Sequence, residues 1–104
     1  MYATIRRYEG IDQKRTEELT RKVDEALLPR LSEMPGFKSY FLIEADNGVM
    51  SSIDFFDTSA HADESTRIAA TWVREEKLDT TLPNPPKVTG GEVIVEKTNE
   101  LVRV

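Results

Sequence analysis

The chain has 104 residues, of which 38% are hydrophobic and 32% charged, a mix typical of one folded domain and not of a disordered chain. Its 14 basic and 19 acidic residues give a formal net charge of −5, and the basic residues occur singly or in pairs among acids, so we expect neither nucleic acid nor a membrane surface as a partner. The chain has no cysteine, which excludes disulfides and thiolate metal sites. It has no apolar run long enough for a transmembrane helix and no apolar stretch typical of a signal peptide, so we expect a cytoplasmic protein.

The first predicted element is a strand over residues 2–8, in which Ala3 and Ile5 alternate with polar or aromatic residues. Gly10 ends this strand, because glycine weakens a strand and favours a turn. Asp12 then provides a suitable N-cap for a helix.

A helix is predicted from Gln13 to about Ser32. Its apolar residues recur at the spacing of one helix face: Leu19, Val23, Ala26, Leu27 and Leu31. Pro29 is expected to kink or end this helix, because proline lacks a backbone N–H and clashes with the preceding turn.

Two strands over residues 37–46 and 49–56 are predicted to form a hairpin around Asn47-Gly48, since both residues tolerate positive φ in a two-residue turn. Such a turn places Asp46 opposite Val49 and fixes the register. One face of the hairpin then carries Tyr40, Leu42, Ser51, Ile53 and Phe55. The other face carries Ser39, Phe41, Ile43, Met50, Ser52, Asp54 and Phe56.

The second helix is predicted from about Ala60 to Leu78, after the capping residues 57–59. Its apolar stripe consists of Ala62, Ala69, Trp72 and Val73, with Thr66 filling a gap. A proline-containing loop over residues 80–87 leads to a last strand over 88–97, where Gly90-Gly91 indicates a bulge or a close backbone contact. Residues 98–104 form a tail that is expected to dock on a neighbour through Leu101, Val102 and Val104.

The order β-α-β-β-α-β is the ferredoxin-like arrangement, in which two helices cover one face of a four-stranded antiparallel sheet and the first strand lies between the third and the fourth. We assign residues 1–97 to this single α+β domain. The face expected under the helices carries Tyr40, Leu42, Ile53, Phe55, Ala3, Ile5, Val93 and Val95. The face expected to remain open carries Phe41, Ile43, Met50 and Phe56 with Arg6 and Asp54, and so many exposed apolar groups predict a homodimer in which two sheets face each other.

The element order, the Pro35-Gly36-Phe37 start of the second strand and the Phe56-Asp57-Thr58-Ser59-Ala60 start of the second helix resemble the dimeric α/β-barrel superfamily. Within it, residues 2–97 are most similar to the antibiotic-biosynthesis monooxygenase-like domains. The resemblance implies a dimer whose sheets form a barrel, with a cavity between sheet and helices in each protomer. Some members are cofactor-independent oxygenases of polycyclic phenols, and others degrade haem.

The haem-degrading branch is disfavoured by the residues at the matching positions. Its members use a histidine within the helix as iron ligand, beside an asparagine on the first strand and a tryptophan. Here the single histidine, His61, opens the second helix, the first strand has no asparagine, and Trp72 alone is not specific. With no nucleotide-binding glycine pattern and no second histidine, we expect neither a cofactor nor a histidine-rich metal site.

Candidate site residues come from the sheet and the second helix. Arg6 is a candidate ligand-binding residue, because a guanidinium beside an apolar cavity can hold a carboxylate or phenolate, and Tyr8 shares its face. Asp54 and His61 are candidate general bases. The alternatives are an Arg6–Asp54 pair that only bridges strands and a solvent-exposed His61. Trp72 and Phe41 are further candidate ligand contacts, with a core position as the alternative for the tryptophan and the dimer contact for the phenylalanine.

Three hypotheses about function follow. The first is a small dimeric protein that binds a small apolar or aromatic ligand. The second is a cofactor-independent monooxygenase or isomerase that acts on a small aromatic or quinone-like substrate. The third is an assembly module that exchanges its C-terminal tail as a strand.

Overall fold

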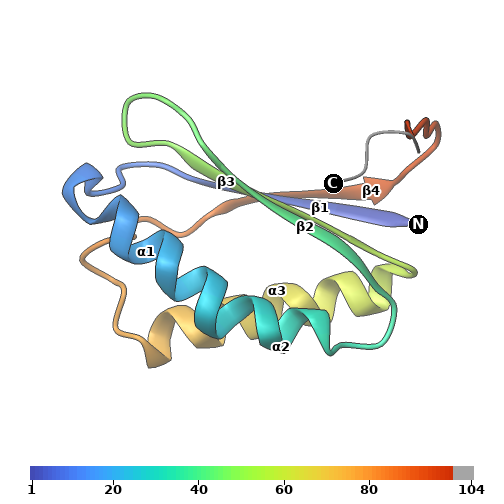
Figure 1. Ribbon diagram of the computed structural model, residues 1–104, viewed down its shortest axis with the longest axis horizontal. Coiled ribbons are helices and arrows are strands. Elements are labelled where there is room, and N and C mark those ends of the chain that lie inside the picture. Colours follow the sequence, from blue (N-terminus) through green and yellow to red (C-terminus); the bar gives the residue numbers. More distant parts are fainter. Residues whose placement is uncertain (100–104) are drawn as a thin grey trace.

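The computed structural model describes residues 1–99 and confirms the predicted element order. Its strands are β1 (Tyr2–Tyr8), β2 (Phe37–Glu44), β3 (Met50–Phe56) and β4 (Lys87–Glu92). They form one antiparallel sheet in the order β2-β3-β1-β4, so β1 lies between β3 and β4 as expected. The helices α1 (Thr16–Lys22), α2 (Leu28–Ser32) and α3 (Ser59–Glu75) all lie on one side of the sheet (Figure 1). The fold is therefore the predicted α+β ferredoxin-like arrangement.

The first helical segment has the predicted extent but is not uniform. It opens with a 3₁₀ turn over Gln13–Arg15, capped by the side chain of Asp12, and a π-helical turn over Val23–Leu27 separates α1 from α2. The N–H of Leu28 bonds to the carbonyl of Val23, one residue further back than in an α-helix. Because Pro29 has no N–H and crowds the turn before it, this wider turn allows the helix to continue through the proline to Ser32.

The hairpin between β2 and β3 has a turn of three residues, where two were predicted. The N–H of Ala45 donates to the carbonyl of Val49 at 2.9 Å, so these two residues pair and residues 46–48 form the turn. Asn47 and Gly48 adopt the expected positive φ, 63° and 73°. One additional turn residue shifts the register by one, which reverses the faces of β3 relative to β2.

The predicted faces of β1 and β3 are consequently wrong. The residues that alternate on the helix-covered face are Tyr40, Leu42, Met50, Ser52, Asp54, Phe56, Thr4, Arg6 and Tyr8. The open face carries an apolar group that we call the open-face patch, which consists of Ala3, Ile5, Phe41, Ile43, Ile53 and Phe55. Phe41 and Ile43 lie there as predicted, with 54% and 46% of their surfaces exposed. The structure instead buries beneath the helices four residues that were expected on the open face: Met50, Phe56, Arg6 and Asp54.

Helix α3 follows its predicted pattern. The side chain of Thr58 accepts a hydrogen bond from the N–H of His61 and caps the helix. The predicted stripe is confirmed, because Ala62, Ala69 and Trp72 are buried against the sheet and the first helical segment. Within residues 1–99, no helix has both the length and the apolar character required to cross a bilayer.

The last strand is shorter than predicted. Strand β4 ends at Glu92, and Val95, expected beneath the helices, is 85% exposed. The ladder between β1 and β4 is regular, so the glycine pair forms no bulge. Instead Gly90 provides the close contact, since a Cβ there would lie 3.0 Å from the ring of Tyr2. The predicted docking residues Leu101, Val102 and Val104 lie outside the described residues.

Candidate functional site

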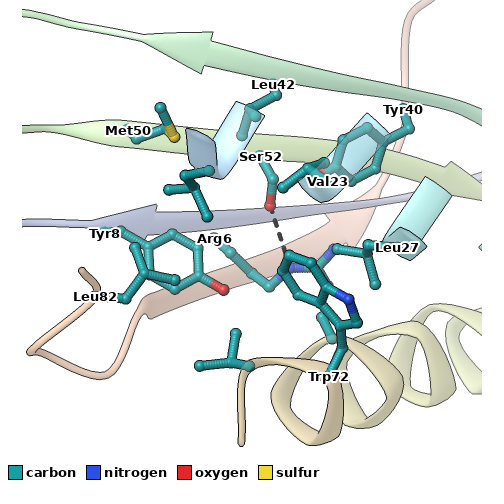
Figure 2. Close-up of a pocket in the computed structure, with 13 residues that line it drawn as sticks. Arg6, Tyr8, Val23, Leu27, Tyr40, Leu42, Met50, Ser52, Trp72 and Leu82 are labelled. Carbon is teal, nitrogen blue, oxygen red and sulfur yellow. Dashed lines mark hydrogen bonds between the residues drawn. The ribbon is translucent and has the colours of Figure 1, made fainter. Parts of the chain in front are cut away.

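A cavity of about 30 Å³ lies between the sheet and the helices (Figure 2). Its apolar wall comes largely from the first helical segment and the hairpin: Leu19, Val23, Leu27, Leu42 and Met50. Its polar side chains are Arg6, Tyr8, Tyr40, Ser52 and Trp72. The cavity thus combines polar side chains at the centre of the helix-covered face of the sheet with apolar side chains around them.

Arg6 extends from β1 across β3 to α3 and is only 2% exposed. Its Nε donates to Ser52 Oγ at 3.2 Å, its Nη1 donates to Thr66 Oγ1 at 2.9 Å, and its Nη2 donates to the carboxylate of Asp54. The guanidinium thus binds two strands and a helix together. Of the five N–H groups that a guanidinium carries, three thus donate to side chains among residues 1–99.

Asp54 is fully buried and balances the charge of Arg6. Its Oδ2 also accepts from Ser65 Oγ at 3.3 Å, while its Oδ1 has no hydrogen-bond partner among residues 1–99. Burial raises the pKa of Asp54, and the nearby Arg6 and Ser65 offset part of that rise. Since Asp54 already pairs with Arg6 and does not line the cavity, the two side chains form a neutral structural pair.

The cavity presents neutral hydrogen-bond donors. Burial raises the pKa of Tyr40 to about 12, and burial likewise raises the pKa of Tyr8. Both phenols are therefore protonated at neutral pH. The indole ring of Trp72 rises from α3 toward the strands (Figure 2), is 1% exposed, and its Nε1–H has no acceptor among the described residues. A buried donor without a partner carries a desolvation cost that a bound acceptor would relieve.

Two of the candidate residues lie away from the cavity. His61 is at the surface at the start of α3, where its Nδ1 lies 2.6 Å from Asp57 Oδ1. Phe41 belongs to the open-face patch and contacts the ring of Phe55 edge-on, with 6.3 Å between ring centroids. The structure thus brings Arg6, Tyr8 and Trp72 together, and separates His61 and Phe41 from them.

Sequence reasoning chose Tyr8 and not Tyr40 as a candidate ligand contact, and it missed Ser65 as a partner of Asp54. A correct hairpin register would have placed Tyr40 opposite Asp54, and the structure has Tyr40 in the wall of the cavity. Ser65 lies three residues after Ala62 and four before Ala69, so helical spacing already placed it on the buried side of α3, where it donates to Asp54.

Two larger spaces adjoin the cavity. The first, of about 200 Å³, lies between α3 and the proline-containing loop, and shares Arg6, Tyr8 and Leu82 with the cavity. The second, of about 870 Å³, is an open groove between α1 and β2. Among residues 1–99, no group of three or more His, Cys, Asp or Glu side chains is placed to hold a metal ion.

No protein-family model and no curated protein matches the chain, whereas solved structures do. A protein of unknown function from Nitrosomonas europaea has a TM-score of 0.73 and 21% identity, with 94% of this chain and 93% of that chain covered. A Streptomyces coelicolor monooxygenase in complex with the ligand nanaomycin D has a TM-score of 0.71 and 13% identity, with 95% and 92% covered. A dimeric ferredoxin-like protein from an uncultured marine organism has a TM-score of 0.70 and 17% identity, with 95% and 92% covered.

These likenesses extend over nearly the whole chain at low sequence identity, so they concern the fold. Another neighbour is an antibiotic biosynthesis monooxygenase, with a TM-score of 0.66, 14% identity, and coverage of 91% of this chain and 100% of that chain. The resemblance predicted from the element order is thus confirmed at the level of the fold. The chain has the fold of the antibiotic biosynthesis monooxygenases and of dimeric ferredoxin-like proteins.

Proposed function

We propose that this protein binds a small apolar or aromatic ligand between the sheet and the helices, beside Tyr8, Tyr40 and Trp72. The observation that carries the proposal is the unpaired, buried Nε1–H of Trp72 in the wall of an otherwise mostly apolar cavity. A ligand with an apolar body and one acceptor oxygen would pair with that donor and keep the walls dry. The nanaomycin D complex of the Streptomyces neighbour supports a small-molecule site on this fold.

The cavity must widen to admit such a ligand. Its volume of about 30 Å³ holds one or two waters, whereas an apolar cavity that binds benzene measures about 150 Å³. The adjoining space of about 200 Å³ shares Arg6, Tyr8 and Leu82 with the cavity, so a rotation of Tyr8 or Leu82 would merge the two. Binding is therefore expected to involve a rearrangement of side chains in this wall.

Trp72 is the only tryptophan in the chain, so its fluorescence reports directly on the cavity. We would titrate the protein with neutral aromatic compounds, including quinones, and measure fluorescence together with the melting temperature. Ala69→Leu should abolish both responses, because Ala69 lines the cavity and is 3% exposed. Ala60→Leu, on the exposed side of the same helix, is the matched control. If no compound changes either signal, the proposal is wrong.

We further propose that the protein is a homodimer through the open-face patch. Ile5, Phe41 and Ile43 are 39%, 54% and 46% exposed, an apolar density that a monomer of this size rarely leaves in water. One neighbour with this fold is described as dimeric. Phe41→Asp should halve the mass measured by light scattering, and Thr71→Asp, on the exposed side of α3, should not. A monomeric wild-type protein at micromolar concentration would rule this interface out.

A cofactor-independent oxygenase or isomerase is the second candidate, favoured by the monooxygenases among the structural neighbours. The described cavity wall contains no histidine or carboxylate, its two phenols are protonated at neutral pH, and Asp54 is paired with Arg6. A proton acceptor for catalysis would therefore have to be part of the substrate. Turnover of a quinol by wild-type protein, lost in Tyr40→Phe and Tyr8→Phe, would establish the enzymatic alternative.

A further inference from the structure

The groove between α1 and β2 adjoins the cavity. Val23, Tyr40 and Leu42 form part of the wall of both spaces, so these three side chains are the partition between them. The groove has about 870 Å³, against about 30 Å³ for the cavity, and it is open to solvent along the β2 edge of the sheet. A ligand that turns Tyr40 aside would occupy both, with its apolar part inside and its other end in the groove.

The groove has an acidic rim. Glu17 and Asp24 from the first helical segment and Glu44 from the end of β2 line it, against one cation, Arg21. All four side chains belong to exposed residues, and no ion pair within residues 1–99 engages the three carboxylates. The rim thus offers acceptors that a cationic group can bind without displacing a protein partner.

The interior disfavours an anion. Among the described residues of the cavity wall, Arg6 is the one cation, and Asp54 already balances its charge. A ligand carboxylate placed there would be buried beside a neutral pair, which is costly in a low-dielectric interior. The remaining polar groups, the phenols of Tyr8 and Tyr40 and the unpaired Nε1–H of Trp72, are neutral donors for an uncharged oxygen.

We propose that the groove is the outer half of the ligand site and takes an ammonium group, whose apolar body extends past Tyr40 to Trp72. The inference rests on the proposed ligand site and adds the charge of its ligand and the route by which the ligand enters. It departs from the expectation that Arg6 holds a carboxylate or phenolate, because the structure pairs Arg6 with Asp54.

The test uses three probes with one skeleton: 4-phenylbutylamine, 4-phenylbutanol and 4-phenylbutanoate. Trp72 fluorescence, excited where a phenyl ring does not absorb, gives the dissociation constants. An exposed ion pair changes an equilibrium about 1.5- to 5-fold, so three unpaired carboxylates predict that the amine binds about tenfold tighter than the acid. The alcohol should lie between them, and added salt should weaken only the preference for the amine.

Substitutions locate the charge effect. Glu17→Gln, Asp24→Asn and Glu44→Gln should each weaken amine binding about 1.5- to 5-fold and leave alcohol binding unchanged. Glu64→Gln, which removes the same charge from the outer side of α3, is the control and should change neither.

Three results would each overturn the inference and leave the ligand site standing. They are equal binding of amine and alcohol, tightest binding of the acid, and a preference for the amine that survives the substitution of all three carboxylates. If none of the three probes alters fluorescence or melting temperature, the inference is overturned, and the titration with quinones decides separately whether the ligand site stands.

Discussion

The buried pair of Arg6 and Asp54 gives the sharpest prediction about stability. Asp54→Asn keeps the size of the side chain but removes the carboxylate that balances Arg6, which is 2% exposed. Loss of one partner from a buried ion pair costs about 3–5 kcal/mol, because the remaining charge stays in a low-dielectric interior. For a domain of this size, each kcal/mol lowers the melting temperature by about 4–8 °C, so we expect a fall of at least about 12 °C.

The double variant Arg6→Met with Asp54→Leu separates this charge effect from packing. It removes both charges and fills similar volume, so it should recover most of the stability lost in Asp54→Asn. The neighbouring exposed pair of Arg7 and Glu9, with 2.8 Å between nitrogen and oxygen, is the control, and Glu9→Gln should leave the free energy of unfolding nearly unchanged. Urea unfolding followed by circular dichroism provides all four free energies of unfolding. A cost below about 1 kcal/mol for Asp54→Asn, or a double variant less stable than the single one, would refute the reasoning.

Three further predictions concern single positions. The pKa of Tyr40 is raised from 10.0 to about 12 in the folded protein, so the stability that its protonated phenol contributes is present below pH 10 and is lost as the pH rises through 12. Tyr40→Phe should therefore remove up to about 2–3 kcal/mol of the stability loss at alkaline pH, which urea unfolding below and above pH 10 measures. Gly36→Ala should lower the free energy of unfolding by more than about 1 kcal/mol, because Gly36 has φ 78° and a Cβ there would clash with the carboxylate of Asp57. Adding Asp57→Ala should restore only the steric part of this loss, and a Gly36→Ala variant as stable as the wild type would contradict the reasoning. Thr58→Ala should cost about 1 kcal/mol by removing the cap of α3, whereas Thr58→Ser should keep it, as thermal unfolding can show.

Local patterns were sufficient to predict the elements and their order. The helical spacing of Ala62, Ala69 and Trp72 correctly identified the buried side of α3. Asn47-Gly48 correctly located the hairpin, and both residues adopt positive φ. These signals are short-range, so a single sequence carries them in full.

The faces of the sheet could not be predicted from the same patterns. Strand β3 carries apolar residues on both sides, such as Ile53 on one and Phe56 on the other, so alternation does not choose between them. The structure buries the charged residues Arg6 and Asp54 and exposes Ile5, contrary to the usual preference for apolar residues inside. The candidate site follows from that register: Arg6 and Tyr8 lie beneath the helices with Trp72, whereas Phe41, on the open face as predicted, lies away from them.

The three-residue turn has a consequence for how the chain folds. A two-residue turn at the same Asn47-Gly48 would place Ile53 and Phe55 beneath the helices and Asp54 in water, an arrangement of similar apolar content without a buried charge. The hairpin therefore has a competing register, and chains that first pair in it must separate their strands before they reach the native state. Refolding should accordingly show a slow phase that shrinks when residue 46 is deleted, because a two-residue turn then pairs Ala45 with Val49 as in the native sheet. The length of this turn thus selects one of two registers in which β2 and β3 can pair.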